Sequence, residues 1–108
     1  MTDRELLEAA ARAAGIVGFW VDAGLNTRSN AWPVIWNPIV DDGDALRLAV
    51  KLQLQVTPGT YNKDEFTAFH AGRGEAHEYR HFQQDEFAAT RRAIVRAAAE
   101  IGTHKEGA

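Results

Sequence analysis

The run VDDGDALRLAVKLQLQVT, residues 40–57, constrains the fold most because its hydrophobic period changes midway. Its first part repeats apolar residues at the three- and four-residue spacing of a helix, at Ala45, Leu48, Ala49 and Leu52. Leu46 and Val50 widen that apolar face, so we expect a largely buried helix that packs against a sheet. From Leu52 onward apolar and polar residues alternate, as in a half-buried strand. A helix that runs directly into a strand predicts a domain built from both kinds of element.

Signals at the helix ends predict two further helices. Thr2 and Glu5 have the spacing of a capping box at the start of a helix over residues 3–14, and Gly15 is placed to stop it. Near the end of the chain, Asp85 is placed to cap a helix over residues 86–101. The apolar face of this last helix is predicted to contain Phe87, Ile94, Ala98 and Ile101.

Four short runs have the composition or alternation of strands. They cover residues 16–21, 52–57, 65–71 and 78–82, and a loop is predicted over residues 22–38. The predicted order is α-β-α-β-β-β-α, in a single α+β domain over residues 1–102 with a frayed tail at 103–108. Strands joined by short turns predict a mainly antiparallel sheet covered by helices.

The composition excludes several classes of protein. The 108 residues include no cysteine, which rules out disulfides, thiolate zinc sites and cysteine nucleophiles. No run approaches the roughly 20 apolar residues of a membrane span. The N-terminus is acidic and amphipathic, unlike a signal peptide, so we expect a cytoplasmic protein without membrane contact. The net charge of -3 argues against a dedicated nucleic-acid binder, which usually has a basic excess.

The segment HEYRHF, residues 77–82, has the His-Glu-x-x-His spacing of zinc metalloproteases. In those enzymes the motif lies on a helix, so that both imidazoles reach one ion. Here Gly72 and Gly74 disfavour a helix, and an extended segment would separate His77 from His81 by about 13 Å. We therefore expect histidines on a strand, and neither a metal site nor a cofactor.

Two groups of side chains remain as candidate binding residues. Arg92 and Arg96 are four residues apart on the last helix, and with Arg80 they would form either a phosphate-binding stripe or a solvated face. Trp32 and Trp36 would serve either as exposed contacts or as anchors of the predicted loop. A third tryptophan, Trp20, is expected in the core.

Three segments resemble one phage family. Residues 36–52, WNPIVDDGDALRLAVKL, are similar to the central motif of the phage ABA sandwich domain. Residues 85–102, DEFAATRRAIVRAAAEIG, and residues 10–16, AARAAGI, resemble it as well. The resemblance implies a small protein of tailed phages or prophages, with a sheet between helical layers in an α/β/α sandwich. It implies no activity and no catalytic residues.

These observations favour a phage or prophage accessory protein in the bacterial cytoplasm that acts by binding and is not an enzyme. The first hypothesis is a protein-interaction module that binds an unknown protein partner or itself, through residues around Trp32 and Trp36 or the free edge of the sheet. The second is a nucleic-acid-binding domain that uses Arg80, Arg92 and Arg96. The third is a zinc hydrolase that uses His77, Glu78 and His81.

Overall fold

The computed structural model of the protein describes residues 2–28, 34–57, 65–69, 75–79 and 86–107. Its helices are α1 (Asp3–Ala14), α2 (Asp42–Lys51) and α3 (Glu86–Gly107). Its strands are β1 (Phe19–Val21), β2 (Gly24–Asn26), β3 (Ile35–Trp36), β4 (Gln55–Thr57), β5 (Glu65–Phe69) and β6 (Glu75–Tyr79). The predicted α+β class is confirmed.

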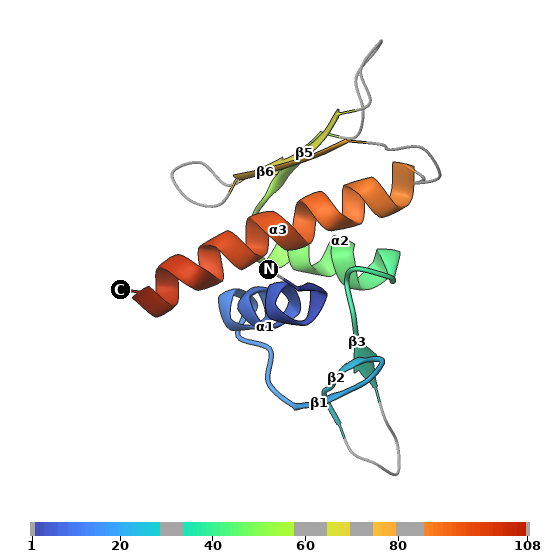
Figure 1. Ribbon diagram of the computed structural model, residues 1–108, viewed down its shortest axis with the longest axis vertical. Coiled ribbons are helices and arrows are strands. Elements are labelled where there is room, and N and C mark those ends of the chain that lie inside the picture. Colours follow the sequence, from blue (N-terminus) through green and yellow to red (C-terminus); the bar gives the residue numbers. More distant parts are fainter. Residues whose placement is uncertain (1, 29–33, 58–64, 70–74, 80–85, 108) are drawn as a thin grey trace.

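The elements stack in layers with α3 at the centre (Figure 1). Helix α3 packs against α1 and α2 on one side and against β5 and β6 on the other. The strands form two antiparallel sheets, β1-β2-β3 and β4-β5-β6, at opposite ends of this stack. All three helices therefore lie on the same side of the β4–β6 sheet. The α/β/α sandwich implied by the resemblance is not the observed arrangement.

The composition of α3 explains its central place. Between residues 93 and 99 every side chain except Arg96 is buried, namely Ala93, Ile94, Val95, Ala97, Ala98 and Ala99. A helix with so wide an apolar face is stable only where neighbours cover most of its surface. At Gly102 the backbone of α1 comes so near that a Cβ atom would collide with the carbonyl oxygen of Ala9. The β4–β6 sheet on one face of α3 and the helices α1 and α2 on the other provide this cover.

The predicted signals at both ends of α1 are confirmed. The Thr2 hydroxyl accepts a hydrogen bond from the Glu5 N–H at 3.1 Å, and the Glu5 carboxylate accepts one from the Thr2 N–H at 2.9 Å. Hydrogen bonding to the Glu5 carboxylate, first from the Thr2 backbone N–H and then from the Thr2 side chain, lowers the pKa of the Glu5 carboxyl. Gly15 ends the helix in the left-handed conformation with φ 71°.

The prediction of a loop over residues 22–38 is wrong in part, because β2 and β3 lie within it. Both strands pair antiparallel in one sheet with β1, and this register aligns Trp20, Leu25 and Trp36 across the strands. Gly24 permits the turn into β2, with φ 143° and the carbonyl oxygen of Trp36 only 2.6 Å from where a Cβ would stand. Strands of two or three residues are too short to show the alternation by which strands are recognised.

Helix α2 is confirmed, but its surroundings differ from the prediction. It packs mainly against α3, and Leu46 and Val50 are exposed, because its buried face is narrow and consists of Asp44, Ala45, Leu48 and Ala49. The following strand begins at Gln55 instead of Leu52. Gln53 takes a left-handed conformation with φ 55°. The Leu54 N–H donates to the Ala49 carbonyl oxygen at 2.9 Å and closes the helix end.

The last third of the chain follows the predicted order with shifted boundaries. Strand β5 pairs antiparallel with β4 and β6, and β6 covers residues 75–79 instead of 78–82. Helix α3 continues to Gly107, so the predicted frayed tail is helical up to that residue. Phe87, which was expected on the buried face of this helix, is exposed. The predicted cap at Asp85 lies outside the described residues.

Candidate binding groove

Two surface pockets adjoin each other between α1 and β1, and Trp20 lines both of them. The first, here called the Asp22 pocket, has a volume of about 340 Å³, and its lining includes Arg4, Leu7, Trp20, Asp22, Asn37 and Ile39. The second, here called the Val17 pocket, has a volume of about 240 Å³, and its lining includes Glu8, Ala11, Ile16, Val17, Trp20 and Leu25. Together they form the α1–β1 groove.

Helix periodicity makes one wall of the groove continuous. Arg4 and Leu7 line the Asp22 pocket, while Glu8 and Ala11 line the Val17 pocket. Residues three and four apart lie on one face of a helix, so successive turns of α1 present these side chains in a row. The opposite wall is the extended chain that leads from Ile16 through β1 to Asp22.

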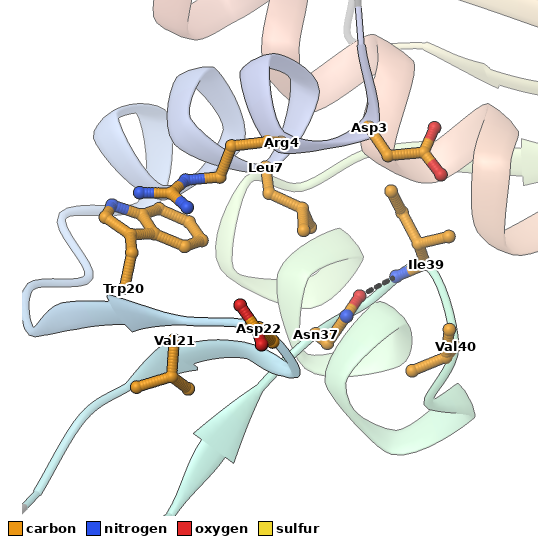
Figure 2. Close-up of a pocket in the computed structure, with 10 residues that line it drawn as sticks. Asp3, Arg4, Leu7, Trp20, Val21, Asp22, Asn37, Ile39 and Val40 are labelled. Carbon is orange, nitrogen blue, oxygen red and sulfur yellow. Dashed lines mark hydrogen bonds between the residues drawn. The ribbon is translucent and has the colours of Figure 1, made fainter.

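Trp20 separates the two pockets and is itself covered by Arg4. The Arg4 guanidinium carbon lies 4.4 Å from the centre of the Trp20 ring, which is the geometry of a cation–π contact (Figure 2). The Arg4 Nε is also 3.9 Å from a carboxylate oxygen of Glu8 on the next turn. Arg4 therefore fixes the indole between helix and strand, and its own charge is offset within the groove.

The far wall of the Asp22 pocket is held by Asn37. Its side-chain amide donates to the Ala23 carbonyl oxygen at 2.9 Å, and its side-chain oxygen accepts from the Ile39 N–H at 3.1 Å (Figure 2). Its backbone N–H donates to the buried Asp44 carboxylate at 2.9 Å. These bonds tie the β1–β2 turn to the start of α2. The pocket is consequently walled by three elements whose backbone positions are fixed.

The charges of the groove leave one carboxylate without an ionic partner. Asp3 is 3.2 Å from the Arg92 guanidinium of α3, and Arg4 is occupied as described above. Asp22 lies at the tip of the β1–β2 turn, is exposed, and makes no salt bridge within the described residues. The Asp22 pocket therefore has a local negative charge at its open end.

The strand that borders the groove is an edge strand. Sheet order β1-β2-β3 leaves the outer edge of β1 without a hydrogen-bonded neighbour strand among the residues that the structure describes. Val17 is 82% exposed and Phe19 is 41% exposed, although both are large apolar residues. An open strand edge with exposed apolar side chains is a surface on which another chain can pair.

The residues selected from the sequence do not converge on one site. Trp36 is only 6% exposed and packs in the core. Arg92 binds Asp3 of α1, and Arg96 is exposed on α3. Trp32 and Arg80 lie outside the described residues. Arg92, one of the arginines predicted to bind phosphate, therefore pairs with a carboxylate of the same chain.

The first residues of the His-Glu-x-x-His motif do not lie on a helix, as a zinc metalloprotease would require. His77 and Glu78 lie in strand β6, which pairs with β5 over its full length, so the start of the motif is extended as predicted. His81 lies outside the described residues. Within the part of the chain that the structure covers, no three His, Asp or Glu side chains gather in a way that could hold a metal ion.

Comparison with known proteins gives no relatives. No family model matches the chain, and neither the curated proteins nor the solved structures include a match. The resemblance to the phage ABA sandwich domain therefore stays a prediction. Within the described ranges, no helix is long and apolar enough to cross a lipid bilayer.

Sequence reasoning missed the α1–β1 groove because none of its residues forms a motif. Trp20 was expected in the core, and it does pack against the core cluster, but it is also half-exposed between the two pockets. The useful signal was the mixture of charged and apolar residues on one face of α1, at Arg4, Leu7, Glu8 and Ala11. The same pattern occurs wherever the apolar face of a helix meets its solvent-exposed face. Only the position of β1 shows that this face of α1 borders a groove.

Proposed function

We propose that this protein is a non-catalytic protein-interaction module that binds a partner protein in the α1–β1 groove. The observation that carries the proposal is the exposure of Val17, which lines one of two adjoining pockets, next to a strand whose outer edge has no neighbour strand among the described residues. Apolar side chains exposed beside concave surfaces are a common feature of interaction sites.

The proposed biological setting is a phage or prophage protein in the cytoplasm of a bacterial host. It is favoured by the resemblance of residues 36–52 and 85–102 to the phage ABA sandwich domain. The proposed partner is accordingly a phage protein, a host protein or a second copy of this chain.

The test is a selection of displayed protein fragments from a phage and its host against the full chain, followed by titration calorimetry of the purified binders. Val17→Asp places a charge in the groove at a side chain that is already 82% exposed, so the fold should tolerate it. We expect this variant to weaken binding at least about tenfold, because a buried unpaired charge opposes docking.

Val50→Asp on α2 is the matched control. Val50 is 69% exposed, is also valine, and lines neither pocket. Binding by this variant should equal that of the natural chain. Binders that respond equally to both substitutions, or only to Val50→Asp, would remove the groove as the interaction site. Light scattering on the same variants will show whether a second copy of the chain is the partner.

A further inference from the structure

We propose that two copies of the chain pair through the face of the β1-β2-β3 sheet that is turned away from α1, here called the outer sheet face. The proposal goes beyond the proposed function, because the α1–β1 groove lies on the other face of the same sheet. Three properties carry it: the apolar side chains on this face, the lack of a described element that covers it, and the absence of charged residues from its strands.

The pairing register defines the two faces of the sheet. In Figure 2, Trp20 extends from β1 toward Arg4 of α1, whereas the next side chain, Val21, extends the opposite way. Successive residues of a strand alternate between the two faces, and residues paired across strands share a face. The inner face therefore carries Trp20, Leu25 and Trp36. The outer sheet face carries Phe19, Val21, Gly24, Asn26 and Ile35.

The outer sheet face is apolar and open. Phe19 is 41% exposed, and Val21 and Ile35 are half-buried. In Figure 1 the helices lie on one side of this sheet, and no described helix or strand lies on the other side. A strand with large apolar side chains on both faces is typical of a sheet that is covered on both faces. The outer sheet face therefore lacks a cover that the described part of a single chain does not provide.

The absence of charge favours a second copy of the chain as this cover. The strands β1, β2 and β3 contain no Asp, Glu, Lys or Arg, although 25% of the residues in the chain are charged. Depletion of charged residues marks the centre of protein interfaces, and homodimer interfaces are the more apolar class. A charged partner would gain no ionic contact here. A second copy brings an apolar face of the same kind, and a two-fold axis would bring the same residues of both copies together.

The one polar side chain on this face is already bonded within the chain. The Asn26 side-chain oxygen accepts hydrogen bonds from the N–H groups of Arg28 at 3.0 Å and Val34 at 3.4 Å. Asn26 is only 2% exposed in the single chain. A second copy can therefore cover the outer sheet face without the cost of removing water from an unbonded side-chain oxygen.

The size of the outer sheet face limits the strength of the dimer. Three strands about 4.8 Å apart, with up to three residues each, span roughly 14 Å by 10 Å. A standard interface buries about 800 Å² on each partner, which is more than such a face offers. We therefore expect a dissociation constant between about 10 μM and 1 mM, so that dimerisation depends on protein concentration.

Sedimentation equilibrium of the full chain across this concentration range tests the proposal. Phe19→Thr removes the ring but keeps a residue that favours strands, and it should weaken dimerisation at least about tenfold. Val21→Thr changes the shape of the face less and should weaken dimerisation about fivefold, because its hydroxyl would be covered. Val50→Thr on α2 is the matched control at a valine that is 69% exposed, and its dissociation constant should equal that of the natural chain. Circular dichroism verifies that each variant is folded.

The location of the interface is tested by amide chemical shifts measured at increasing protein concentration. We expect changes at residues 19–21, 24–26 and 35, and not along α2. A chain that stays monomeric up to about 1 mM would overturn the proposal, as would a dimer that Phe19→Thr and Val21→Thr leave unchanged. A dimer lost in Glu8→Lys but kept in Phe19→Thr would place the second copy in the α1–β1 groove, which overturns this inference and supports the proposed function.

Discussion

A single missing side chain sets the distance between the two longest helices. Gly102 of α3 faces the backbone of Ala9 in α1, and a Cβ at this position would overlap the Ala9 carbonyl oxygen. The neighbouring atom belongs to the backbone of a packed helix, so it cannot rotate away. We expect Gly102→Ala to lower the free energy of unfolding by about 2–3 kcal/mol, because overpacking outweighs the roughly 1 kcal/mol by which alanine favours a helix.

Gly43 of α2 provides the control for this residue-scale prediction. A Cβ there would meet only the ends of side chains, namely the Arg47 guanidinium at 3.2 Å and the Asp41 carboxylate at 3.3 Å. Gly43→Ala should therefore raise the free energy of unfolding by up to about 1 kcal/mol. Urea unfolding of both variants measures the difference, and a Gly102→Ala protein as stable as the natural chain would contradict the close helix approach.

At the scale of elements, two helices end in the same way with different residues. After α1, the N–H groups of Gly15 and Ile16 bond to the carbonyl oxygens of Arg12 and Ala11. After α2, the N–H groups of Gln53 and Leu54 bond to Val50 and Ala49 in the same pattern. The left-handed residue is glycine in the first case and glutamine in the second, with φ 71° and 55°. Only glycine adopts this conformation without strain.

Exchange of these two residues tests the role of the helix ends. Gln53→Gly should raise the free energy of unfolding by about 0.5–1 kcal/mol, and Gly15→Gln should lower it by about 1 kcal/mol. No atom lies within 4 Å of the position of a Cβ on Gly15, so the second effect reports backbone strain without a collision. Thermal unfolding is a sufficient measurement. The two changes in the free energy of unfolding must have opposite signs. A destabilised Gln53→Gly protein would contradict the left-handed conformation assigned to residue 53.

The same helix end shows where prediction from sequence stops. The spacing of apolar residues correctly indicated three helices, over residues 3–14, 40–53 and 86–101, because many residues contribute to each pattern. The boundary between α2 and β4 was placed at Leu52, since LQLQVT alternates regularly. The structure assigns Gln53 to a left-handed turn, which a glutamine does not signal. Short strands such as β2 and β3 gave no signal, because their pairing with β1 depends on contacts between distant residues.

At the scale of the whole molecule, the sequence predicted the α+β class but not the central place of α3. Alanine contributes little to an amphipathic pattern, yet the buried alanines of α3 allow α1 and the sheet to approach from opposite sides. The α1–β1 groove is a consequence of this arrangement, since it needs α1, β1 and the residues that precede α2 to meet. Asp22 and Val17 became candidate binding residues only when their neighbours in space were known.

Adjacent arginines on α3 make different contributions to this arrangement, and this difference gives the last prediction. The Arg91 Nε donates to the Ile39 carbonyl oxygen at 2.7 Å, and its Nη1 donates to Asp42 at 2.6 Å. Its side chain is 18% exposed, so these bonds are partly shielded from water. Arg92 lies 3.2 Å from Asp3, a side chain that is itself exposed.

Replacement of each arginine by methionine separates these two contributions. Arg91→Met should lower the free energy of unfolding by about 1–3 kcal/mol, because a charged group bonded to a backbone carbonyl and a carboxylate is lost. Arg92→Met should cost no more than about 1 kcal/mol, as expected for a surface ion pair. Because Ile39 also lines the Asp22 pocket, Arg91→Met should in addition alter the amide chemical shifts of residues 37–40. Equal losses in both variants would contradict the larger contribution assigned to Arg91.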